Sequence, residues 1–157
     1  MGTRRYAREL AMQALFSMDM NSAFSPEMLA EYGRCFPPNK KVGPYFQRLT
    51  EGVVQYKDHI DKVIERYSSN WKVRRMACVD RNILRLAVFE LLYCGDIPAK
   101  VSINEAIDIA KKFGSGESGS FINGILDSIR AALEKQELQT IDLPVPAEQV
   151  AETENDG

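Results

Sequence analysis

Residues 79–93 read VDRNILRLAVFELLY, and this stretch decides the fold. Wound as an α-helix, it is apolar on nearly every side, which is typical of a helix buried at the centre of a protein. Arg85 and Glu90 are the charged residues inside its apolar part. Because they lie five residues apart, they do not share a helix face, and we expect two structural salt bridges or interface contacts rather than a catalytic acid–base pair.

Amphipathic helices are predicted on both sides of this central segment, because apolar residues recur there at intervals of three and four. The predicted helices cover about residues 4–20, a short segment from Ser25-Pro26 to before Pro37-Pro38, about 24 residues from Pro44 as one helix or two, a helix after Pro98 with Ser102 and Glu105 in capping-box spacing, and a last helix from about Ser118 to Lys135. No segment alternates with the two-residue period of a strand, so the sequence predicts an all-α fold.

The composition predicts one folded unit that stays in the cytoplasm. The chain has 157 residues, of which 45% are hydrophobic, enough to bury one core. It contains neither the roughly 18 consecutive apolar residues of a membrane span nor the apolar stretch of a signal peptide. Seven acidic residues and one basic residue lie from residue 134 onward, which leaves 19 basic and 15 acidic residues in 1–133. We expect a helical domain over residues 1–138 and an acidic, proline-containing disordered tail over residues 139–157.

Patterns that indicate catalysis or metal binding are weak. The three cysteines are widely spaced and form no CxxC pair, and His59 is the single histidine. Residues 114–119 match GxGxxG, but they join two predicted helices instead of a strand and a helix. We interpret Gly114 as a helix C-cap and the following residues as a flexible turn. The sequence therefore predicts a protein that is not an enzyme and needs no cofactor or metal.

A basic surface is predicted where the first helix begins. Arg4, Arg5 and Arg8 are expected opposite the apolar stripe of that helix, with no acidic residue among the first eight positions. A helical basic face is a common phosphate-binding feature, although three arginines can also form an ordinary solvated surface. Lys111 and Lys112, followed across the glycine loop by an aromatic residue, offer a second basic and aromatic element.

Several strings together resemble the NusB family of transcription antitermination factors. RRYARELAMQALF at residues 4–16 is similar to the arginine-rich opening helix of that family, and VDRNILRLA with the following VFEL is similar to its central helix. VSINEAI at residues 101–107, AKKFG at 110–114 and FINGILD at 121–127 are similar to its two closing helices. The strings occur in the family's order and spacing over about residues 4–133.

The resemblance implies a bundle of about six to seven helices in two helical subdomains, and an adaptor that binds RNA. NusB proteins pair with NusE, a small-subunit ribosomal protein, and the pair binds the single-stranded boxA element of nascent ribosomal RNA within an RNA polymerase antitermination complex. The residues implied on the RNA side are Arg4, Arg5, Arg8, Lys111, Lys112, Glu117, Ser118 and Phe121. Those implied on the NusE side are Phe16, Asp80 and Arg81.

Two of these positions carry residues that weaken the implied contacts. Phe16 stands where many family members have tyrosine, so a hydroxyl hydrogen bond to NusE is absent there. Glu117 is an acid beside the RNA side and should weaken phosphate binding.

Two alternative functions remain open at the level of sequence. A NusB-like domain also precedes the catalytic part of some ribosomal RNA cytosine methyltransferases, but no strand, glycine loop and helix unit for a methyl donor is visible. The second alternative is a helical adaptor that binds only proteins. The sequence also leaves open whether the free protein is a monomer or a homodimer.

Overall fold

The structure, a computed structural model, describes residues 2–146. The elements in this part of the chain are α1 (Thr3–Met20), α2 (Pro26–Cys35), α3 (Gly43–Tyr67), the 3-10 turn η1 (Val73–Arg75), α4 (Cys78–Tyr93), α5 (Ala99–Phe113) and α6 (Ser118–Glu134). No strand occurs among the described residues, and the all-α prediction is confirmed. None of the helices described is both long and apolar enough to span a bilayer.

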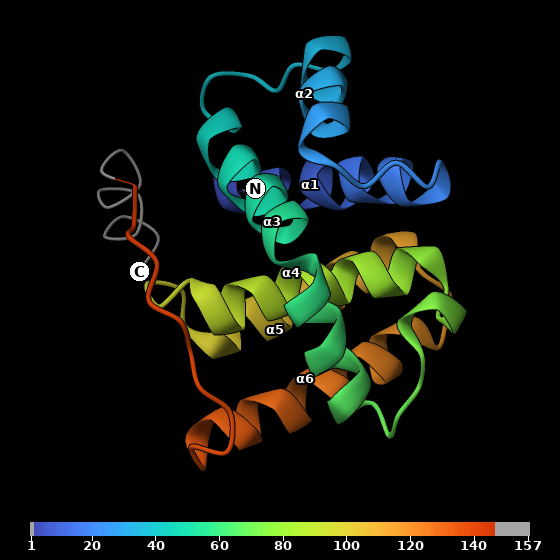
Figure 1. The fold of residues 1–157 in the computed structure, drawn as a ribbon, viewed down its shortest axis with the longest axis vertical. Coiled ribbons are helices and arrows are strands. Elements are labelled where there is room, and N and C mark those ends of the chain that lie inside the picture. Colours follow the sequence, from blue (N-terminus) through green and yellow to red (C-terminus); the bar gives the residue numbers. More distant parts are fainter. Residues whose placement is uncertain (1, 147–157) are drawn as a thin grey trace.

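Helix α4 lies at the centre, as its sequence predicted. Every residue from Asn82 to Tyr93 is buried, and α4 contacts α1, α3, α5 and α6. The helices form two groups: α1, α2 and the first half of α3 form one, and α4, α5 and α6 form the other, with the second half of α3 crossing α4 toward α6 (Figure 1). One hydrophobic cluster runs through both groups, so the two subdomains share a core.

Helix α3 consists of two helical segments joined by a kink at Tyr56, so the stretch predicted as one helix or two is continuous in the chain but broken in its helical geometry. Tyr56 has φ −108° and ψ 17°, outside the helical region, and its ring stacks on Tyr93 of α4. One turn earlier, the backbone of Gly52 lies directly against the ring of Phe89, where a Cβ atom would collide with it. A small residue at position 52 therefore allows α3 to cross α4 closely.

One predicted helix start is confirmed and another is wrong. Ser25 caps α2 by accepting a hydrogen bond from the Met28 amide at 3.2 Å. The predicted capping box at Ser102 does not form, because α5 begins at Ala99 and the carbonyl of Pro98 accepts the first helical hydrogen bonds. Ser102 consequently lies buried within α5.

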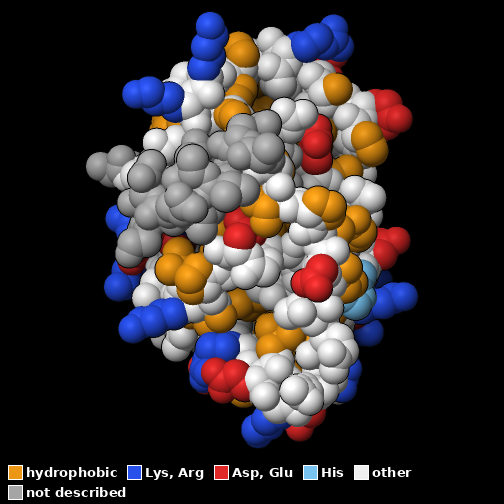
Figure 2. All heavy atoms as spheres, turned by 90° about the vertical axis from the view of Figure 1, so that its left-hand side faces the viewer, with side chains coloured by type: hydrophobic (Ala, Val, Ile, Leu, Met, Phe, Trp, Pro, Cys, Tyr) orange, Lys and Arg blue, Asp and Glu red, His pale blue; other side chains and the backbone are white. Residues whose placement is uncertain are grey.

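The segment that follows α6 packs against the helices. The amide of Ile141 donates to the carbonyl of Leu92 at 2.7 Å, which satisfies a carbonyl in the last turn of α4, and Leu143 packs on the core. Figure 2, a view of the left-hand side of Figure 1, shows apolar side chains exposed between scattered charges on this face. The disordered tail predicted over residues 139–157 stays a prediction: residues 139–146 have no regular secondary structure, and 147–157 lie outside the described residues.

Candidate nucleic-acid interface

Two of the three arginines that open α1 are buried. Arg4 is 7% exposed and Arg8 is 4% exposed. Their guanidinium carbons lie 4.8 Å and 5.4 Å from the ring centroid of Tyr45 on α3, within cation–π distance. The predicted position of these two side chains opposite the apolar stripe is wrong. Positions 4 and 8 share a helix face with Ala11 and Leu15, seven residues further on, and that face lies against α3 and α4.

Arg8 belongs to a buried ion pair with Glu90 of α4. The Nη2 atom of Arg8 lies 2.8 Å from Oε2 of Glu90, and the hydroxyl of Tyr45 donates to the same carboxylate. Burial lowers the pKa of Arg8, but the charge and hydrogen bonds of Glu90 outweigh it, and the pKa lies above its usual value. Burial and the Glu90 charge raise the pKa of Tyr45 well above its usual value. The cluster of Arg8, Tyr45 and Glu90 therefore holds the start of α1 against the core.

Arg5 is the opening arginine that points outward. Its side chain is 43% exposed and lies over α5, where Nε is 2.9 Å from Oε2 of Glu105 and Nη2 is 3.1 Å from Oδ2 of Asp108. Hydrogen bonding to Glu105, followed by its charge, raises the pKa of Arg5. These acids partly neutralise the basic surface that the sequence predicted.

The two lysines near the end of α5 continue this surface. Lys112 is exposed, and its Nζ lies 3.0 Å from Oε2 of Glu9 on α1. Lys111 is exposed and lines a hollow between α5, the glycine loop and the start of α6. Arg5 of α1, which lies over α5, and Lys111 and Lys112 near the end of α5 are thus exposed cations along this helix. We call this strip, with residues 114–117, the α5 face.

The glycine loop is fastened to α4 by Ser118. The hydroxyl of Ser118 donates to Oδ1 of Asp80 at 2.7 Å and accepts from the Ser115 amide at 2.9 Å. A Cβ atom on Gly114 would lie 2.6 Å from Cβ of Ser118 and 2.8 Å from the carbonyl oxygen of Ala110, so this close turn requires glycine. The amide of Gly114 donates to that carbonyl, as the predicted C-cap requires. Ser118 is buried, whereas Glu117 is exposed on the loop.

Phe121 lies one turn into α6 and is half-buried. Its ring meets Trp71 edge to face, with centroids 6.3 Å apart and planes at 72°. Trp71, which precedes the basic residues Lys72, Arg74 and Arg75, was not among the residues implied at the site. Phe121, whose ring it contacts, lies 50 residues away in the sequence, so only the folded structure shows that the two are neighbours.

The residues implied on the NusE side surround the end of α1 and the start of α4. Phe16 is half-buried against the core, and Asp80 is partly exposed beside Ser118. Arg81 contacts Asp19 through two hydrogen bonds, with Nε 2.6 Å from Oδ2. The implied RNA and NusE sides therefore meet where Asp80 bonds Ser118.

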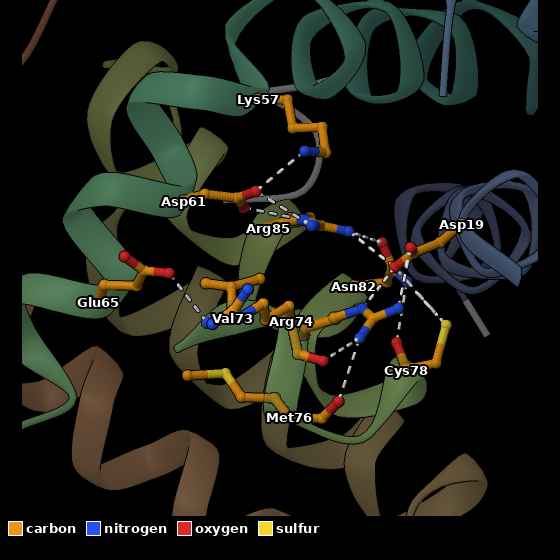
Figure 3. A network of polar contacts seen from close by, with 11 residues as sticks. Asp19, Lys57, Asp61, Glu65, Val73, Arg74, Met76, Cys78, Asn82 and Arg85 are labelled. Atoms are coloured by element: carbon orange, nitrogen blue, oxygen red, sulfur yellow. Dashed lines mark hydrogen bonds and ion pairs between the residues drawn. The ribbon is translucent and has the colours of Figure 1, made fainter. Parts of the chain in front are cut away.

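Asp19 is the centre of a polar network that joins α1, α3 and α4 (Figure 3). Nη1 of Arg85 lies 2.8 Å from Oδ2 of Asp19, and Nε of the same arginine lies 2.8 Å from Oδ1 of Asp61 on α3. Burial raises the pKa of Asp19, but hydrogen bonds from Arg81 and Asn82 and the nearby guanidinium charges lower it to about 2. Arg85 and Glu90 thus belong to two separate structural clusters, as predicted.

Comparisons with known proteins identify related chains. A family model described as the NusB family matches residues 5–131. The transcription antitermination protein NusB of Desulfatibacillum aliphaticivorans is 53% identical over 137 residues, which cover 87% of this chain and 96% of that protein.

Two solved structures have the same fold. The NusB structure from T. maritima aligns with a TM-score of 0.72 and 39% identity over 86% of this chain and 97% of its own. A chain from a crystal structure of antitermination factors NusB and NusE in complex with dsRNA aligns with a TM-score of 0.73 and 29% identity, over 84% and 98%.

Proposed function

The chain belongs to the NusB family, and from this premise we propose that it binds boxA-type single-stranded RNA of nascent ribosomal RNA together with NusE. In this proposal it supports ribosomal RNA transcription as part of an RNA polymerase antitermination complex in the cytoplasm. Membership of the family confirms the prediction that the chain is a transcription factor and not an enzyme.

The observation that carries the proposal is the fold shared with the solved NusB chain that accompanies NusE and dsRNA. The surface chemistry supports it. Arg5, Lys111 and Lys112 expose three cations along the α5 face. Cationic side chains commonly bind phosphate oxygens in nucleic-acid complexes.

The α5 face binds RNA by exchanging partners. Arg5 and Lys112 already hold carboxylates, so a phosphate must replace Glu105, Asp108 and Glu9 as the anion they contact. This exchange makes RNA binding weak for the protein alone and sensitive to salt. Glu117 adds a repulsive charge on the loop.

The buried residues of the implied site fix the position of the elements that form the α5 face. Arg4 and Arg8 fix the start of α1 through Tyr45 and Glu90, and Ser118 fixes the loop through Asp80. A direct RNA contact by Arg8 would require its guanidinium to leave Glu90. We therefore assign RNA contacts to Arg5, Lys111, Lys112 and Phe121, and positioning roles to Arg4, Arg8 and Ser118.

NusE completes the site in this proposal. We assign its contact to Phe16, Asp80 and Arg81, of which Asp80 bonds to Ser118 at the end of the glycine loop. Because Asp80 also accepts the hydrogen bond of Ser118, a partner bound at Asp80 affects the position of the glycine loop beside the RNA. Phe16 contributes apolar area without a hydroxyl, and Phe16→Tyr tests whether a hydrogen bond strengthens NusE binding.

A gel shift against a boxA-type RNA, with NusE titrated in, tests the proposed function. We expect weak retention of RNA by the protein alone, tighter retention with NusE, and weaker binding of an RNA with the same composition in scrambled order. Failure to shift RNA in either condition would favour an adaptor that binds only proteins. Transfer of a methyl group to the RNA from a methyl donor would establish an enzyme instead.

A further inference from the structure

Trp71 is the single tryptophan of the chain and is 57% exposed. It lies in the connection between α3 and η1, and its ring meets the half-buried Phe121 of α6 edge to face. Burying a large aromatic side chain ordinarily stabilises a protein, so an exposed one supported by a second ring suggests an interaction surface.

The turn that presents Trp71 is held by hydrogen bonds on both sides. Ser69 and Asn70 both have positive φ, 56° and 64°, which turns the chain sharply just before the tryptophan. The hydroxyl of Ser68 donates to the carbonyl of Trp71 at 3.3 Å, and the amide of Val73 donates to Oε1 of Glu65 at 3.0 Å. The backbone therefore holds this side chain in an outward position.

Basic side chains follow Trp71 directly. Lys72, Arg74 and Arg75 are exposed. Within residues 2–146, the guanidinium groups of Arg74 and Arg75 form no ion pair. Lys72 lies 4.0 Å from Glu65, whose carboxylate is also bonded to Val73 (Figure 3). An exposed aromatic face beside several cations is the combination that binds an unpaired base and its phosphate.

We propose that Trp71, supported by Phe121, is a base-stacking platform that extends the RNA-binding surface beyond the glycine loop to the basic turn of residues 72–75. One unpaired base stacks on the exposed face of Trp71, and Arg74 and Arg75 contact the adjoining phosphates. This inference rests on the proposed function, because it lengthens the same RNA path from the α5 face past Phe121. The positive charge of the turn favours RNA over an apolar protein segment as the occupant.

Intrinsic fluorescence tests this proposal directly, because all tryptophan emission comes from Trp71. Unlabelled boxA-type RNA is added to the full chain with NusE chosen or engineered to lack tryptophan, and binding is followed in parallel by the anisotropy of a labelled RNA. We expect the emission to be quenched along the same curve as the anisotropy. Trp71→Leu should weaken RNA binding about 5- to 150-fold, and Trp71→Phe should restore most of it.

Matched variants separate the stacking contact from a general effect. Arg75→Ala should reduce the magnitude of the log–log salt slope by about 0.7. Phe36→Leu, at the end of α2, changes another exposed aromatic residue and should leave RNA binding unchanged.

Each contrary result has a distinct meaning. RNA binding without quenching, and with Trp71→Leu at wild-type affinity, would overturn this inference while the proposed function stands. Quenching by NusE alone, with no further change when RNA is added, would identify a protein contact and also overturn it. Absence of any RNA binding, with or without NusE, would remove both proposals.

Discussion

Arg8→Met should strongly destabilise the protein without directly removing an RNA contact. The side chains of Arg8 and Glu90 are 5% and 2% exposed, so the variant leaves a buried carboxylate with Tyr45 as its remaining hydrogen-bond donor. Removing one partner of a buried ion pair costs about 3 to 5 kcal/mol. For a domain of this size, that cost corresponds to a decrease in melting temperature of about 6 to 20 °C.

A double variant distinguishes a buried charge pair from ordinary packing. Arg8→Met with Glu90→Leu removes both charges and leaves the hydroxyl of Tyr45 without its acceptor, at a cost of about 1 to 3 kcal/mol. The double variant should therefore be more stable than Arg8→Met alone. Arg34→Met is the matched control, because Arg34 pairs with Glu31 on the exposed face of α2, and it should change stability by less than about 0.5 kcal/mol.

Urea unfolding followed by helical circular dichroism measures these differences. RNA binding is then measured below the unfolding transition of each variant, where the salt slope for Arg8→Met should equal that of the wild type. A loss of less than about 1 kcal/mol in Arg8→Met, or a double variant less stable than the single one, would refute the buried-pair explanation.

Three further predictions concern acid stability, the acids on the α5 face and the glycine loop. Asp19 has a folded pKa of about 2, below its usual value, so its stabilisation is complete above about pH 5 and is lost as the pH falls through 2. Asp19→Asn should therefore lower the free energy of unfolding by about 1 to 2 kcal/mol at pH 7, after allowance for solvent screening, and this difference should vanish near pH 2 in urea titrations. Glu105→Gln with Asp108→Asn releases Arg5 and should tighten RNA binding about two- to tenfold in anisotropy measurements, whereas unchanged binding would show that these acids do not compete with phosphate. Gly114→Ala should reduce stability by about 1 to 3 kcal/mol in thermal unfolding, because its Cβ collides with Ser118, and a neutral effect would show that the loop adjusts freely.

Much of the fold could be predicted because its signals are local. The apolar surface of residues 79–93 indicated the central helix, and Ser25 followed by proline indicated the start of α2. The start of α5 was placed too late, since Ser102 and Glu105 have capping-box spacing by coincidence and Pro98 begins the helix. The disorder predicted for residues 139–157 stays a prediction; Leu143 packs on the core, and a contact with a surface that exists only after folding has no local signal in the sequence.

The candidate site was harder to predict because its partners are distant in sequence. Arg8 meets a carboxylate 82 positions away, and Arg5 meets one 100 positions away. The seven-residue spacing from Arg4 to Ala11 and from Arg8 to Leu15 was a local sign of burial, but arginine is so rarely buried that its identity suggested surface. The exposure of Trp71 depends on two consecutive residues with positive φ, which their sequence does not specify.

The salt dependence of RNA affinity tests the central claim most directly. Anisotropy titrations of boxA-type RNA with NusE are repeated over a series of salt concentrations for the wild type and Arg5→Ala. Contacts to three to five phosphates predict a log–log slope of roughly −2 to −3.5 for the wild type, with a magnitude lower by about 0.7 in Arg5→Ala. An affinity that does not depend on salt, or a slope that Arg5→Ala leaves unchanged, would contradict an RNA-binding surface built on the exposed arginine of α1.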